Sequence, residues 1–149
     1  MALRPGSAAP PIDGAGVGEG ALALFFYKVT CPVCQMTAPR TARFQEAYPG
    51  RIIGVGQDPD SKLAAFADEH AMGFGSVSDP APYPASDAYG IEVVPTLFVV
   101  DASGRVVEAV ESWDREGYNR ASRALADLTG DPYAEISNAS DGLPPFRPG

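Results

Sequence analysis

The sequence predicts an α/β fold with a central mixed sheet, in which a parallel strand–helix–strand half precedes a C-terminal β-hairpin and helices flank the sheet. Three observations predict it. A continuous apolar run at residues 21–27 contains no Gly or Pro, as in a strand buried on both faces. A helical segment and a second apolar run at residues 51–56 follow, which makes a right-handed parallel crossover unit. Residues 96–100 and 105–110 form two apolar-rich runs joined by Asp-Ala-Ser-Gly, as in a hairpin.

Two helices complete the parallel half. The first follows the second cysteine, over residues 34–48, and Pro49-Gly50 ends it. Pro39 lies inside this helix, where a proline removes one backbone hydrogen bond and kinks the axis. The second helix is predicted over residues 58–71, because its apolar residues recur with helical spacing.

The remaining segments are short or rich in loop-forming residues. Residues 74–77 predict a short strand, and residues 86–89 a helical turn after a proline-rich loop. A closing helix over residues 114–128 carries one apolar stripe. The last residues are rich in Pro, Asp, Ser and Gly. We therefore expect one domain at residues 1–130 and a loosely ordered tail at residues 131–149.

Charge and hydropathy exclude several classes of partner. The chain of 149 residues has 19 acidic against 11 basic residues and a formal charge of -8, so it lacks the concentrated positive charge that nucleic acid requires. The first apolar run is too short to span a bilayer, and the N-terminal residues form no signal peptide. We expect a cytoplasmic monomer. A periplasmic or extracytoplasmic location stays open for a protein whose signal has been removed.

The only two cysteines are spaced as a dithiol, in Cys31-Pro-Val-Cys34. A zinc site needs four ligands, and the chain offers a single histidine, His70, beyond these thiols. A bridge closing so short a loop stabilises a fold little, although an inert disulfide stays an alternative. The spacing therefore favours redox chemistry without a metal or organic cofactor.

Position relative to the elements gives the two thiols different roles. Cys31 follows a buried strand and precedes a helix, so its sulfur lies where free backbone N–H groups and the helix dipole favour a thiolate. Pro32 fits the first helical position and leaves the Cys34 N–H free to point at the Cys31 sulfur. We expect a Cys31 pKa about one to several units below 8.5. Cys31 is then the nucleophile, and Cys34 resolves the mixed disulfide.

Several motifs, taken in order, resemble the thioredoxin superfamily, and within it the TlpA-like and redoxin (AhpC-TSA-like) branch. The resemblance covers residues 4 to 128. It rests on the Gly6-Ser-Ala-Ala-Pro10 opening, the Cys31-Pro-Val-Cys34 motif, Pro39 five residues further on, and Tyr89-Gly-Ile-Glu-Val-Val-Pro95-Thr96 before an apolar strand.

The resemblance implies a thioredoxin-like three-layer fold and a cis Val94–Pro95 bond beside the cysteines. It makes Val94 and Pro95 the platform for an extended substrate, with Pro32 and Trp113 as further substrate-binding residues. A core role for Trp113 stays an alternative. Two positions depart from the family: Thr30 stands where thioredoxins usually have Trp, and Phe25 where many have a buried acid.

The predicted function is thiol-disulfide exchange with protein substrates, with an upstream electron donor as second partner. One alternative is a thiol peroxidase, since the redoxin branch includes peroxiredoxins. Those enzymes have a Thr three residues before the reactive Cys, where this chain has Lys28. The other alternative is a non-catalytic binding module that uses the groove around Pro95.

Overall fold

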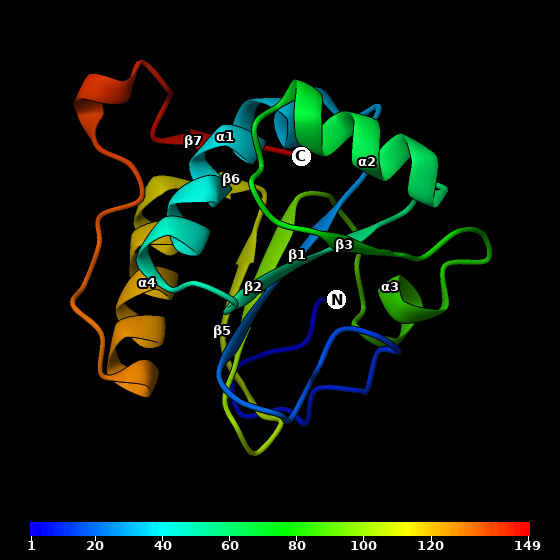
Figure 1. Cartoon of the computed structure of the whole chain (residues 1–149), viewed down its shortest axis with the longest axis horizontal. Helices are drawn as coiled ribbons and strands as arrows, with labels where there is room; N and C mark the ends of the chain where they lie inside the picture. Colours follow the sequence, from blue (N-terminus) through cyan, green and yellow to red (C-terminus); the bar gives the residue numbers. More distant parts are fainter.

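A five-stranded mixed sheet forms the centre of the computed structural model, which describes all residues 1–149 (Figure 1). The strand order is β3-β2-β1-β4-β5. Pairing is parallel between β1, β2 and β3, and antiparallel from β1 to β4 and from β4 to β5. The strands are β1 (Leu22–Tyr27), β2 (Ile52–Gly56), β3 (Ser76–Ser78), β4 (Thr96–Val100) and β5 (Val106–Glu111).

Four helices and a short second sheet complete the fold. The helices are α1 (Pro32–Ala47), α2 (Asp60–Glu69), α3 (Pro84–Ala88) and α4 (Arg115–Thr129), with a 3-10 turn at Ala139–Asp141. The second sheet pairs β6 (Trp113–Asp114) with β7 (Phe146–Arg147). No helix combines the length and the apolar character needed to cross a membrane.

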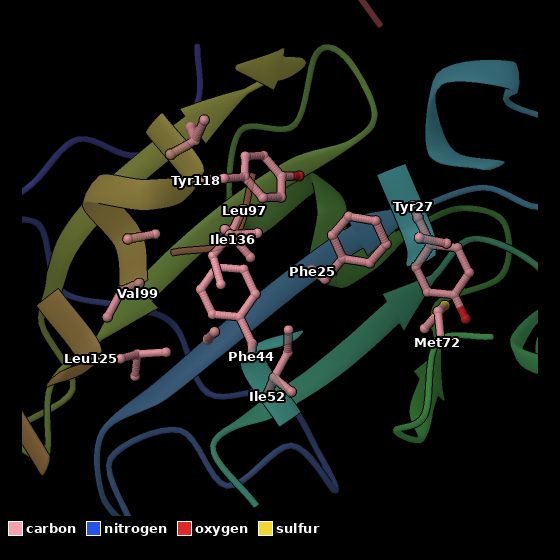
Figure 2. Close-up of a cluster of buried hydrophobic side chains, with 14 of the residues drawn as sticks. Phe25, Tyr27, Phe44, Ile52, Met72, Leu97, Val99, Tyr118, Leu125 and Ile136 are labelled. Carbon is pink, nitrogen blue, oxygen red and sulfur yellow. The ribbon is translucent and has the colours of Figure 1, made fainter. Parts of the chain in front are cut away.

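The central strand β1 explains the layers. All six of its residues are buried, because their side chains alternate between two hydrophobic clusters. Phe25 and Tyr27 face the cluster formed with α1, α2 and α4, whose side chains Figure 2 shows packed over the sheet. Leu24 and Phe26 face the other cluster, with Tyr89 at the end of α3 and residues of the N-terminal segment. The predicted three-layer arrangement is therefore confirmed.

The predicted core elements are also confirmed, with shifts at their ends. No end of a predicted helix or strand moves by more than two residues. Helix α1 begins two residues before the predicted range, at Pro32, which occupies the first helical position as the motif predicts because this position needs no N–H. The short elements β3 and α3 are displaced by one or two residues from the predicted ranges. The strands β6 and β7 were not expected, since two-residue strands carry no sequence pattern.

Residues 131–149 pack against the domain more closely than their composition predicts. Ile136 is fully buried, and its N–H donates to Asn119 Oδ1 of α4 at 2.8 Å. Arg43 of α1 donates to the Glu135 carbonyl at 3.0 Å. The boundary at residue 130 stays a prediction. The segment beyond residue 130 nevertheless packs on α1 and α4, because the Ile136 side chain is buried there and the backbone of residues 135 and 136 is hydrogen-bonded to Arg43 and Asn119.

Candidate active site

Cys31 caps the N-terminus of α1 with its side chain. Its backbone is extended (φ −84°, ψ 116°), and its sulfur accepts a hydrogen bond from the Cys34 N–H at 3.1 Å. Pro32 occupies the first helical position. This is the geometry that the motif predicts, in which a proline leaves the first available N–H group pointing at the sulfur.

The surroundings of Cys31 stabilise its thiolate. Its pKa falls to about 6, chiefly through the hydrogen bond from the Cys34 side chain. The N–H groups of Cys34 and Val33 and the charge of Arg147 lower the pKa further, whereas partial burial opposes them. A thiol with this pKa is largely ionised at neutral pH and is therefore a competent nucleophile.

Cys34 has the opposite character. Its side chain is inaccessible to solvent, and burial raises the pKa of its thiol far above the ordinary value. The hydrogen bond that its thiol donates to Cys31 acts in the same direction. The two cysteines are not bonded to each other. The pair is thus a reduced dithiol with one reactive, accessible sulfur and one protonated, buried sulfur.

The loop before β4 brings Val94 and Pro95 beside Cys31. The Val94–Pro95 peptide bond is cis, as predicted. The Cys31 sulfur lies 3.4 Å from the Val94 carbonyl oxygen and donates to it when the thiol is protonated. Thr96 stabilises this loop, because its hydroxyl donates a hydrogen bond to the Val93 carbonyl at 2.8 Å. The structure therefore brings Cys31, Cys34, Pro32, Val94 and Pro95 together.

Trp113, like Cys34, is a predicted site residue with no exposure to solvent. Its side chain is fully buried, and its ring packs 4.9 Å, centroid to centroid, from Tyr118. Its Nε1–H donates to the Pro144 carbonyl at 2.7 Å. These contacts give Trp113 a clear packing role, and its binding of substrate stays a prediction.

Apolar and hydroxyl groups surround Cys34. Phe25 is fully buried in the same cluster as Cys34. Two buried hydroxyls, on Thr37 and Tyr118, have no hydrogen-bond partner. Burial raises the pKa of Tyr118 well above its usual value, and the nearby Cys34 raises it further. The apolar surroundings are the physical reason for the high proton affinity of Cys34.

His70 lines a pocket together with Val29 and Gln35, which flank the cysteine motif. It follows the last residue of α2, and its ring packs 4.6 Å from that of Phe66. The chain contains no cluster of three or more His, Cys, Asp or Glu side chains arranged to hold a metal ion.

The C-terminal segment contributes site residues that sequence reasoning missed. Arg147 acts on the pKa of Cys31, and its Nη1 lies 3.8 Å from Met36 Sδ. Gly149 lies against the Val94 carbonyl. The sequence held no signal for this, since a proline-rich stretch has no periodicity and over a hundred residues separate it from the motif.

The sheet order, the cis-proline and the cysteine at the N-terminus of α1 define a thioredoxin-like protein with a reduced dithiol. Residues 12–109 match the model of the AhpC/TSA family, and the chain belongs to that family. No curated protein sequence matches the chain.

Solved structures with low sequence identity share the fold. A candidate thiol:disulfide interchange protein DsbE from Chlorobium tepidum is 19% identical with a TM-score of 0.71, over 85% of this chain and 98% of that one. The thioredoxin domain of a thiol-disulfide oxidoreductase from Bacteroides vulgatus is 20% identical with a TM-score of 0.69, over 83% and 99%. A secreted disulfide oxidoreductase from Mycobacterium tuberculosis is 22% identical with a TM-score of 0.56, over 71% and 81%.

Proposed function

We propose that this protein is a thiol-disulfide oxidoreductase that exchanges a disulfide with protein substrates through Cys31 and Cys34. The Cys31 thiolate attacks one sulfur of a substrate disulfide, so a mixed disulfide forms and the other substrate sulfur leaves as a thiolate. Cys34 then gives its proton to a departing thiolate and attacks the Cys31 sulfur. This step releases the substrate and leaves a Cys31–Cys34 disulfide, so two electrons pass from the dithiol to the substrate. The reverse sequence oxidises a substrate dithiol.

The observation that carries the proposal is the asymmetry of the two thiols. Hydrogen bonds from the Cys34 thiol and, at 3.1 Å, from the Cys34 N–H stabilise a Cys31 thiolate with a pKa of about 6, while Cys34 is buried and protonated one turn away. An attacking thiolate and a protected resolving thiol are what the two steps require. The similar proteins from B. vulgatus and M. tuberculosis are described as a thiol-disulfide oxidoreductase and a disulfide oxidoreductase, which supports the same chemistry.

A pair of matched serine variants tests the mechanism. With insulin as the disulfide substrate, Cys34→Ser should accumulate a mixed disulfide on Cys31, because the resolving thiol is gone. Cys31→Ser, which makes the same chemical change three residues earlier, should form no adduct, because Cys34 is buried. Mass spectrometry under non-reducing conditions measures both. Equal adduct in the two variants, or none in either, would refute the assignment of roles.

Membership of the AhpC/TSA family keeps the peroxidase as a second candidate, since the same Cys31 thiolate can attack peroxide. The chain departs from the peroxiredoxin motif at Lys28, which stands where those enzymes have Thr. Consumption of hydrogen peroxide by the reduced protein, compared with Cys31→Ser, separates the candidates. A peroxidase consumes peroxide quickly, and an oxidoreductase does so only slowly. A non-catalytic binding module that uses the groove around Pro95 would keep its function when both cysteines are replaced by serine.

We propose that the protein is a monomer in the cytoplasm. Its proposed partners are proteins with thiols or disulfides and a thiol electron donor. The similar protein from M. tuberculosis is described as secreted. The reduction potential distinguishes the compartments, because a cytoplasmic reductant near about -270 mV differs strongly from an oxidant near about -120 mV.

A further inference from the structure

The chain's own C-terminal segment lies on the proposed substrate platform. The Gly149 backbone is so close to Val94 that an added Cβ atom would be 2.1 Å from the Val94 carbonyl oxygen and 3.4 Å from Pro95 Cδ. Val94 O is also the atom to which the Cys31 thiol donates. An extended peptide and Gly149 therefore cannot occupy this position together.

Independent contacts hold the segment there. Gly149 N donates to Ser112 Oγ at 3.0 Å, and Ser112 N in turn donates to the Pro95 carbonyl at 2.8 Å. One step back along the chain, β7 pairs with β6, with Arg147 opposite Trp113. The Trp113 indole reaches the Pro144 carbonyl, and Arg115 donates to the Leu143 carbonyl at 2.7 Å. The segment 143–149 is thus bound mainly through its backbone, as an extended peptide would be.

The same segment passes close to the reactive sulfur. Arg147 Nη1 lies 3.8 Å from Met36 Sδ on the first turns of α1, and its positive charge favours the Cys31 thiolate. Figure 1 shows the segment running from β7 beside α1. It spans the space between the helix that carries the cysteines and the loop that carries Pro95.

We propose that residues 143–149 act as an internal occupant of the substrate groove, which a protein substrate must displace before Cys31 can attack its disulfide. The proposal rests on the proposed function. Two features of the segment 143–149 favour reversible binding. Three of its seven residues are proline and lack an N–H, and the Phe146 side chain is 54% exposed. A groove that is free for only part of the time lowers the apparent reactivity toward large substrates by that fraction.

Two variants of the full chain loosen the segment by different routes. Gly149→Ala places a methyl group against the Val94 carbonyl, so the segment must shift. Ser112→Gly removes the hydroxyl that accepts from Gly149 N, and glycine adopts the φ of +67° at that position without strain. Gly75→Ala is the matched control, because no atom lies within 4 Å of the added methyl group.

Two disulfide probes with the same leaving group measure access. One is a short extended peptide with a single cysteine linked to 5-thio-2-nitrobenzoate, and the other is cysteamine linked to the same group. Cys31 attacks the non-aromatic sulfur, the disulfide breaks, and the coloured thiolate is released. The assay is run near about pH 8, where Cys31 is ionised whether or not Arg147 is near.

We expect both loosening variants to react at least about threefold faster than the parent with the peptide probe, while the cysteamine rate stays within about twofold. Gly75→Ala should match the parent with both probes. Equal acceleration of both probes, or of neither, would overturn the proposed occlusion and leave the exchange chemistry intact. If no variant releases the thiolate from cysteamine, the proposed function fails, and the occlusion fails with it.

Discussion

Cys31 and Cys34 carry the same side chain but hold their protons very differently. Cys31 caps α1, and hydrogen bonds from the Cys34 thiol and from the Cys34 N–H lower its pKa to about 6. Cys34 lies in an apolar cluster with Phe25, where burial raises the pKa of its thiol. Position relative to one helix end therefore separates the proposed nucleophile from the proposed resolving thiol.

The pKa of Cys31 leads to a prediction for the pH dependence of its reactivity. The thiolate fraction rises with pH, so the rate of alkylation by iodoacetamide should reach half its maximum at about pH 6 and level off above neutral pH. Cys34 should not react in the folded protein, and Cys31→Ser serves as the control. A half-maximum near about pH 8.5, the value of a free cysteine, would contradict the description of the site.

Tyr48 is a second residue whose contacts make a quantitative prediction. Its buried hydroxyl lies 2.7 Å from Ser122 Oγ on α4 and accepts from the Ala134 N–H at 3.2 Å. Tyr48→Phe should lower the free energy of unfolding by about 1–3 kcal/mol, because these polar groups lose a partner. Urea denaturation measures the loss. Tyr83→Phe, which removes a hydroxyl without a hydrogen bond, should change stability by less than about 0.5 kcal/mol.

At the scale of elements, the sequence predicted the parts whose patterns are local. The apolar run of β1, the two apolar-rich runs and the turn of the β4–β5 hairpin, and the proline at the first position of α1 each determine their structure through nearby residues. The site followed from the same logic, since Cys31 at a strand–helix junction must lie at a helix end. What the sequence could not predict depends on distant contacts: the pairing of β6 with β7, and the position of Arg147 and Gly149 beside the Pro95 loop.

The packing of α1 on the sheet predicts the effect of a core truncation. Phe44 is fully buried between the helix and the strands, and its ring lies 6.2 Å from that of Tyr118 on α4 (Figure 2). Phe44→Ala should therefore destabilise the protein by about 3–5 kcal/mol, through lost burial and the cavity left behind. Urea denaturation compares it with Phe146→Ala, the same change at an exposed position, which should cost less than about 1 kcal/mol. Equal losses would contradict the assigned core.

At the scale of the whole molecule, three segments far apart in sequence meet at one end of the sheet. The strand–helix junction supplies Cys31, the loop before β4 supplies Val94 and Pro95, and the C-terminal segment lies across both. The helices α1, α2 and α4 cover the face of the sheet behind them, so the buried thiol is shielded while the reactive one is partly exposed. The fold thereby places one partly exposed thiol and one buried thiol at the same end of α1.

The most direct test of the central claim is a redox titration of the reduced protein against graded glutathione couples, with free thiols counted at each point. We predict that both thiols disappear together in a single transition, because the Cys31–Cys34 disulfide forms, at a potential within about -270 to -120 mV. Loss of only one thiol, with glutathione left attached to Cys31 and no internal disulfide, would contradict the assignment of this pair as an exchanging dithiol.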